Sequence, residues 1–214
     1  MSISHDIVYA CPYCGKEFAM TVQDSVNASQ DPDLRDRCLS GDIFKQTCPH
    51  CQADFMAMTP IVYSDPEHRF VLWLSDKELP EAVKKQADVL VKAGYRLRRC
   101  LDIQEFTEKI QIFEDGVDDV LVEIAKYDSF IEFIDNRKGN PEDVTSIEYQ
   151  STRNDVMKIN IRTGDKGMSF HIPVNLLAEE IKAEKDLYAI NDRDIPVVNS
   201  QWVISLFNEP AGQA

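Results

Sequence analysis

The sequence has no apolar run long enough to cross a membrane. No segment approaches the ~18–20 apolar residues that a membrane-spanning helix needs, and the opening MSISHD lacks the basic start and apolar core of a signal peptide. We therefore expect a soluble, cytoplasmic protein without membrane contact. In a reducing cytoplasm its thiols would stay available to bind metal.

Basic residues are also scarce, because 23 lysines and arginines stand against 37 acidic residues and leave a formal net charge of −14. Binding of a phosphate backbone needs a basic face, so we do not expect a nucleic acid partner. The one basic cluster comprises Arg96, Arg98, Arg99 and, upstream, Lys84, Lys85 and Lys92. We expect it to pair with the neighbouring acidic segment or to face solvent, the alternative being an anion site.

Catalytic motifs are missing as well. The chain has no nucleophile elbow, no glycine-rich loop opening a helix after a strand, and no His-Glu-x-x-His. The four histidines are scattered, and His171 is expected at the surface of a strand whose residues Phe170 and Ile172 face the core. A set of acids flanks Gly116 and is expected to cap a helix, with divalent cation binding as the alternative: Glu114, Asp115, Asp118 and Asp119. We therefore favour a protein that is not an enzyme.

What the sequence does contain is two cysteine pairs, Cys11-Pro12-Tyr13-Cys14 and Cys48-Pro49-His50-Cys51. A Cys-x-x-Cys turn points two thiolates at one ion, and two such turns supply the four tetrahedral ligands of a closed zinc site. Proline presets each turn, and Gly15 permits the positive φ that leads into a strand. We expect one Zn²⁺ per chain, bound by Cys11, Cys14, Cys48 and Cys51.

Other uses of the same cysteines remain open. Four thiolates also suit a single iron ion, as in rubredoxin, and Cys-Pro-Tyr-Cys is similar to the active site of glutaredoxin. A redox cysteine needs a helix N-terminus to lower its pKa, whereas residues 16–23 alternate like a strand. A pair of structural disulfides is the last alternative. The remaining Cys38 and Cys100 are expected to be small buried hydrophobic residues.

The expected architecture is α+β in two domains, a zinc-ribbon-like β unit over 1–75 and an α+β domain over 76–214. In the first, a short helix over 31–39 is inserted between the cysteine pairs, and a hairpin joins strands 60–64 and 68–74. In the second, a helix begins near Pro80 with Gly94 just past its end, and a strand follows over 95–101. A helical pair then spans 102–127, with a capping box at Asp102 and Glu105. Strands at 130–134, 145–150, 156–161 and 168–172, then two helices, complete the chain.

The two Cys-Pro-x-Cys words, the Asp31-Pro32-Asp33-Leu34 helix and Ser40-Gly41 before Thr47-Cys48-Pro49 together resemble the bacterial CpXC family. The segment from Glu108 to Asp119 is similar to the one that often follows this domain. The resemblance implies a bacterial cytoplasmic origin and assigns the four-cysteine cage, but it names no reaction. Gln52 departs from the glycine expected after the second pair and is predicted to weaken that turn slightly.

These observations lead to one expected function and two alternatives. We expect a non-catalytic protein whose zinc ribbon scaffolds a surface for another protein or for self-association. The alternatives are a rubredoxin-like iron electron carrier and a thiol–disulfide oxidoreductase.

Overall fold

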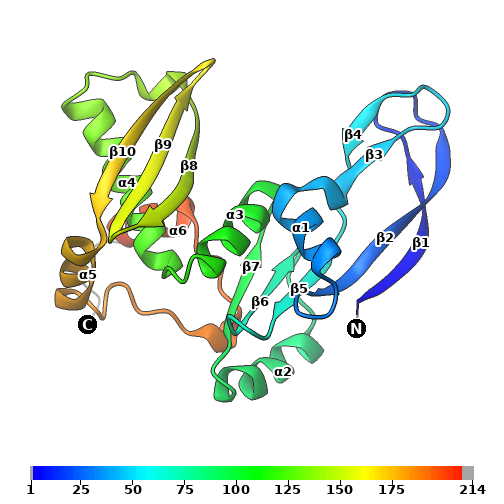
Figure 1. The fold of residues 1–214 in the computed structure, drawn as a ribbon, viewed down its shortest axis with the longest axis horizontal. Helices are drawn as coiled ribbons and strands as arrows, with labels where there is room; N and C mark the ends of the chain where they lie inside the picture. Colours follow the sequence, from blue (N-terminus) through cyan, green and yellow to red (C-terminus); the bar gives the residue numbers. More distant parts are fainter. Residues whose placement is uncertain (1, 209–214) are drawn as a thin grey trace. The chain divides into compact units, whose positions relative to one another are not determined.

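The computed structural model describes residues 2–208 and has the α+β architecture expected from the sequence (Figure 1). The strands are β1 (Ile3–Ala10), β2 (Glu17–Asn27), β3 (Lys45–Thr47), β4 (Asp54–Met56), β5 (Ile61–Asp65), β6 (Phe70–Leu74), β7 (Arg96–Cys100), β8 (Val144–Arg153), β9 (Val156–Thr163) and β10 (Lys166–Pro173). The helices are α1 (Pro32–Ser40), α2 (Glu81–Lys92), α3 (Ile103–Glu114), α4 (Asp119–Asp135), α5 (Val174–Ala183) and α6 (Ser200–Asn208).

The chain forms two compact units. Unit 1 comprises the residues up to Ile110 together with Asp192–Pro196, and unit 2 comprises Gln111–Asn191 and the residues from Val197. The boundary expected at residue 75 falls inside unit 1, between β6 and α2, because the sheet of this unit continues beyond it into β7. An independently folding 1–75 domain therefore stays a prediction.

Unit 1 is built on a five-stranded sheet in the order β1-β2-β5-β6-β7. The hairpins β1–β2 and β5–β6 are antiparallel, whereas β2 pairs with β5 and β6 pairs with β7 in parallel. The residues between β2 and β5 form α1 and the small antiparallel hairpin β3–β4. The expected inserted helix and the expected hairpin after the second cysteine pair are thus both present.

Both faces of the inner strand β6 are covered, which explains its uninterrupted apolar sequence FVLWL. On one face Val71 and Trp73 pack with Ala87 of α2 and with Leu97. Another part of the core is aromatic, with ring-centroid distances of 5.7 Å for Tyr63–Phe70, 6.1 Å for Tyr63–Phe106 and 5.8 Å for Phe44–Phe106. The strands β5, β6 and β7 therefore share the large apolar core of unit 1.

The segment Asp192–Pro196 returns to unit 1 from far along the chain. Ile195 is 3% exposed within the cluster around Trp73, the Arg99 amide donates to the carbonyl of Pro196 at 3.1 Å, and the buried guanidinium of Arg98 pairs with Asp192. This short segment thus completes the core of a unit whose other residues end at Ile110.

Unit 2 contains the antiparallel meander β8-β9-β10 that the sequence predicts. One face of the sheet carries Met157, Ile159 and Ile161, all with 0% exposure, and α4 contacts β8 and β9. Just after the end of α3, the Tyr149 hydroxyl of β8 donates a hydrogen bond to the Asp115 carboxylate at 2.7 Å. The two expected C-terminal helices correspond to α5 and α6.

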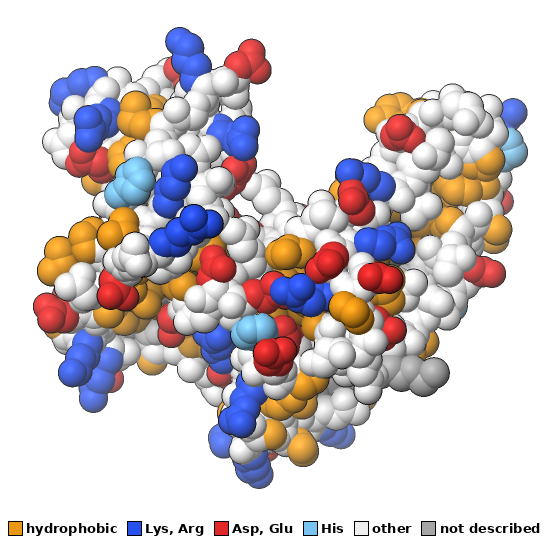
Figure 2. Space-filling view, in the orientation of Figure 1, with side chains coloured by type: hydrophobic (Ala, Val, Ile, Leu, Met, Phe, Trp, Pro, Cys, Tyr) orange, Lys and Arg blue, Asp and Glu red, His pale blue; other side chains and the backbone are white. Residues whose placement is uncertain are grey.

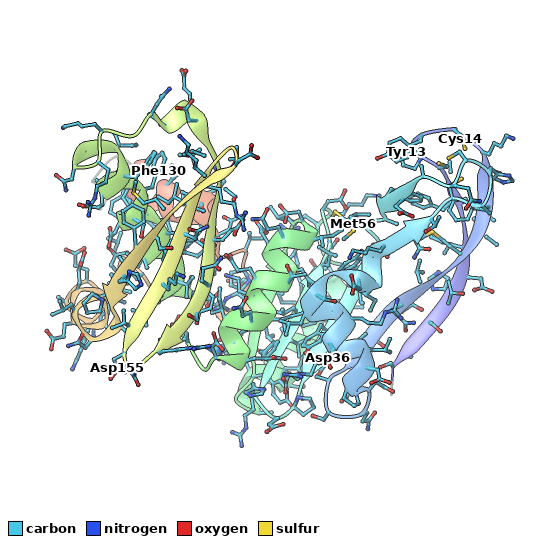
Figure 3. The ribbon with its side chains drawn as sticks, turned by 45° about the horizontal axis from the view of Figure 1, so that its top comes forward. Tyr13, Cys14, Asp36, Met56, Phe130 and Asp155 are labelled. Atoms are coloured by element: carbon cyan, nitrogen blue, oxygen red, sulfur yellow. The ribbon has the colours of Figure 1, made fainter. Side chains whose placement is uncertain are left out.

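The expected strand over 130–134 is wrong, because α4 continues through these residues to Asp135. The sequence FIEFI has strong strand propensity, but the buried side chains Val122, Ala125, Ser129 and Phe133 recur at helical spacing. Ser129 also donates its hydroxyl to the Ala125 carbonyl at 2.7 Å within the helix. Packing of this stripe therefore overrides the local propensity, and Phe130 lies on the helix (Figure 3).

Candidate metal centre

Each cysteine pair occupies the turn of a β-hairpin. The first pair connects β1 to β2 and the second connects β3 to β4. Figure 3 shows Tyr13 and Cys14 at the tip of the long β1–β2 hairpin, where the end of the β3–β4 hairpin also lies. The strands after Cys14 and Cys51 are those that the polar–apolar alternation predicts, so neither pair stands at the start of a helix.

The two turns repeat one backbone hydrogen-bond pattern. In each turn, the amide of the first cysteine donates a hydrogen bond to the carbonyl of the residue five positions later. The carbonyl of the same cysteine accepts a hydrogen bond from the amide of the residue four positions later. The first turn has Cys11 N to Lys16 O at 3.0 Å and Gly15 N to Cys11 O at 2.9 Å; the second has Cys48 N to Ala53 O at 3.0 Å and Gln52 N to Cys48 O at 2.9 Å. The two knuckles are therefore structurally equivalent.

The equivalence extends to the residue after each second cysteine. Gly15 has φ +70° and Gln52 has φ +60°, so both lie in the left-handed region. Glycine adopts this conformation freely, whereas glutamine does so at a cost of about 1 kcal/mol. The Gln52 side-chain amide donates to the Pro49 carbonyl at 3.2 Å and offsets part of that cost. The second turn thus keeps its geometry despite the departure from glycine.

The turns bring all four cysteine sulfurs within 4.8 Å of one another. The Sγ–Sγ distance is 3.7 Å between Cys11 and Cys51 and 3.8 Å between Cys14 and Cys48. A tetrahedron with each sulfur about 2.3 Å from a central zinc ion has edges of about 3.8 Å. The spacing of the donors therefore fits a four-thiolate metal site.

The surroundings of the sulfurs favour the thiolate form at Cys48 and the thiol form at Cys51. The Tyr13 amide donates to Cys11 Sγ and the His50 amide donates to Cys48 Sγ, each at 3.4 Å. Although burial raises the pKa of Cys48, hydrogen bonds from the backbone and from neighbouring thiols outweigh it and lower that pKa to about 6. Although a backbone hydrogen bond lowers the pKa of Cys51, burial and hydrogen bonds with the neighbouring thiols outweigh it and raise that pKa to about 12. Cys11 and Cys48 are buried and Cys14 and Cys51 are exposed, so one side of the cage faces solvent.

A small apolar cluster on β1, β2 and β4 lies next to the cysteine turns. Tyr9 stacks on Phe55 at a centroid distance of 5.7 Å, and Phe18 meets the same ring edge-on at 6.3 Å. Buried Met20, Val22 and Ala57 complete this cluster. Sequence reasoning did not single out these residues, although their alternation with polar residues beside the cysteines was the available signal.

One contact joins the hairpins at the level of the cysteines. The His50 ring lies 3.2 Å through Nε2 from the Glu17 carbonyl, and its side chain is exposed. His50 was expected to face solvent, and it does so while bridging the second knuckle to the start of β2.

The other candidate residues lie elsewhere. Cys38 and Cys100 are buried as expected, with 0% and 1% exposure, and burial raises the pKa of Cys38 to about 12. In the basic cluster, Arg98 pairs with Asp192, and Arg99 pairs with Glu78 at 2.9 Å. These two arginines therefore form ion pairs within the protein, as expected.

The acids around Gly116 take structural positions. Asp118 is the N-cap of α4 and accepts from the Val120 amide at 2.9 Å, while Asp115 accepts from Tyr149. Among residues 2–208, the sulfurs of Cys11, Cys14, Cys48 and Cys51 are the group of potential ligands close enough to share an ion.

The fold and the site define a class: an α+β protein with a four-cysteine cluster assembled from two equivalent Cys-Pro-x-Cys hairpin turns. A comparison with protein families gives the particular assignment, since the profile described as "CpXC protein" matches residues 9–126. The chain therefore belongs to the CpXC family. Searches of curated proteins and of solved structures give no match. Over the part of the chain that the structure describes, no helix has the length and apolarity of a membrane span.

Proposed function

We propose that the chain binds one Zn²⁺ through Cys11, Cys14, Cys48 and Cys51, and that the ion has a structural role. The observation that carries the proposal is the sulfur spacing of 3.7 and 3.8 Å, which equals the edge of a zinc tetrathiolate tetrahedron. Four protein ligands leave no position for substrate. When bound, the ion would supply folding free energy, on the order of 10–16 kcal/mol in zinc-finger peptides.

The biological role we propose is a scaffold for contact with another protein or with a second copy of the chain. The cage joins two hairpins, and large apolar side chains on them and just after β4 reach solvent: Val8 and Tyr13 are each 69% exposed, Met56 45% and, beyond β4, Met58 37%. By fixing both hairpins, the ion would give these side chains a defined arrangement. Within residues 2–208 none of the six cysteines forms a disulfide, which supports a cytoplasmic protein, and the net charge of −14 supports one that does not bind nucleic acid.

The test is elemental analysis with an absorption spectrum, on protein expressed without added metal. We expect one zinc per chain, no visible band, and no zinc in Cys14→Ser. Cys38→Ser is the matched control and should keep its zinc, because Cys38 is a buried thiol outside the cluster. Wild-type protein isolated without stoichiometric metal would refute the proposal.

A second candidate is rubredoxin-like iron, and the exposure of Cys14 and Cys51 favours it. Two solvent-facing thiolates would bring a redox-active ion within reach of an electron-transfer partner. One iron per chain, with thiolate charge-transfer colour and a reversible one-electron couple, would replace the structural role by electron transfer. A colourless, redox-silent protein would eliminate this candidate.

A further inference from the structure

The solvent-facing side of the β8-β9-β10 sheet in unit 2 carries a hollow lined by basic side chains, and none of its residues belongs to the four-cysteine cluster. A cavity of about 460 Å³, open to solvent, is lined by Gln150, Ser151, Arg153, Val156, Lys158 and His171. Three of these six side chains are basic or can become cationic, in a chain whose net charge is −14. Figure 2 shows basic and histidine side chains gathered over this sheet.

Strand register places these side chains on one face. Lys158 of β9 lies directly opposite Ser151 of β8 on one side and His171 of β10 on the other. Arg153 and Val156 form the next row, two residues along, and therefore point to the same side of the sheet. The opposite side is the buried one, with Met157 and Ile159 at 0% exposure. The lining residues thus form two adjacent rows on the solvent face.

A β-bulge shapes the hollow. The register between β8 and β9 shifts between Tyr149 and Ser151, so Gln150 is an extra residue in β8. Its carbonyl is held by the Gln111 side-chain amide at 2.7 Å. Bulges bend a strand and re-aim side chains, and they are frequent beside functional sites.

The charges in the hollow are not neutralised within the protein. Across residues 2–208, no acidic side chain forms an ion pair with Arg153, Lys158 or His171. The next row on the same face differs, because Glu148 there accepts from Arg162 at 3.1 Å. At one end of this face the charges of Arg162 and Glu148 compensate each other. At the other end the basic side chains lie beside the Ser151 hydroxyl and the Gln150 amide.

We propose that this hollow binds a small phosphorylated molecule through Arg153, Lys158 and His171. Arginine and lysine form strong charge-assisted hydrogen bonds with phosphate oxygens, and Ser151 adds a neutral donor. Because the three basic side chains lie on three strands and in two rows, they suit a diphosphate or an organic phosphate better than a single phosphate ion. The volume falls within the ~300–1,000 Å³ range of small-molecule sites.

The experiment is a titration of the full-length protein with pyrophosphate, followed by backbone amide NMR at constant ionic strength. We expect saturable shifts centred on residues 150–158 and 171. Arg153→Gln and Lys158→Gln should each weaken binding roughly tenfold or more, the effect of losing one charge-assisted hydrogen bond. Arg162→Gln is the matched control on the same face of β9 and should change the affinity less than about twofold, since Arg162 is engaged with Glu148.

Parallel titrations distinguish the sources of the phosphate. Tighter binding of a nucleoside diphosphate or a sugar phosphate than of pyrophosphate would identify an organic ligand, and equal binding would identify the phosphate groups alone. Two results would overturn the proposal: shifts spread over all surface lysines without saturation, or equal weakening by all three substitutions. Binding only to anionic lipid vesicles would likewise refute a small-molecule site.

Discussion

Removal of the metal is predicted to release the tips of the two hairpins and to leave the centre of the unit 1 sheet folded. Without the ion, the contacts that join the β1–β2 tip to the β3–β4 tip are the Tyr9–Phe55 and Phe18–Phe55 ring pairs and the His50–Glu17 hydrogen bond. The strands β5, β6 and β7 are held instead by the separate core around Trp73 and by the aromatic cluster around Phe106.

The magnitude follows from these contacts. Beyond the apolar area that they bury, two aromatic pairs contribute roughly 1–3 kcal/mol together, and an exposed hydrogen bond contributes about 0.5 kcal/mol. The tip without metal should therefore open at a cost of at least about 3 kcal/mol, which corresponds to a protection factor of about one hundred or more. With metal, an additional ~10 kcal/mol raises the cost of local opening into the range of global unfolding, about 5–15 kcal/mol.

Hydrogen–deuterium exchange of the full-length protein, before and after removal of metal by a chelator, measures this difference. Amides in residues 17–24 and 45–58 should lose protection by about a hundredfold or more, while those in β6 and β7 change little. Cys38→Ser loaded with metal should exchange like the wild type. A change of less than tenfold at the tips would show that the apolar cluster alone holds them, and the structural role of the ion would then be wrong.

Three further predictions concern single residues. Gln52→Gly should raise the free energy of unfolding by about 0.5 kcal/mol and Gly15→Ala should lower it by about 1 kcal/mol, because both residues have a left-handed backbone conformation that favours glycine. The cost at Gly15 would come from the backbone alone, since an added Cβ there meets no atom within 4 Å. Denaturation of the metal-loaded protein measures both free energies, and effects of the same sign and size would contradict the argument. Cys38 should resist alkylation at pH 8 in the native protein, since burial raises its pKa to about 12; labelling at the rate of unfolded protein, detected by mass spectrometry, would be inconsistent with this. Burial and the charge of Glu180 raise the pKa of Asp128 to about 6, so its carboxylate opposes folding above pH 6 and this penalty disappears as pH falls toward 4. Asp128→Asn should therefore stabilise the protein at pH 7, by less than about 1 kcal/mol because water screens the exposed side chain, and should have no effect at pH 4; a constant difference across this range in pH-dependent denaturation would contradict it.

The features that could be predicted from the sequence are those with a local cause. The two cysteine turns, Gly15 and the strands that follow are specified within a few residues of each cysteine. The capping box is equally local: the Glu105 amide donates to Asp102 and the Leu101 amide donates to Glu105, each at 2.8 Å. Such contacts depend only on side chains that are close in the sequence, so they can be predicted from the sequence.

The features that could not be predicted depend on distant parts of the chain. The parallel pairing of β2 with β5 joins residues separated by α1 and the β3–β4 hairpin. Arg98 pairs with Asp192, 94 positions away, and no pattern near Arg98 in the sequence indicates this partner. Residues 130–134 are helical because Phe133 packs in the interior of unit 2, which a count of local propensity does not include. The four-cysteine cluster could be predicted from the sequence, whereas the hollow lined by Arg153, Lys158 and His171 depends on the register of three strands.

The return of Asp192–Pro196 to unit 1 has a consequence for biosynthesis. A ribosome extends the chain by about 5–20 residues per second, so the roughly 80 residues of Gln111–Asn191 separate the two parts of unit 1 by about 4–16 s. Throughout that interval Trp73 and Leu97 lack their contact with Ile195, and Arg98 lacks Asp192. Unit 1 therefore reaches its final structure only late in translation, and a nascent chain arrested before Asp192 presents the apolar surface that chaperones and proteases recognise.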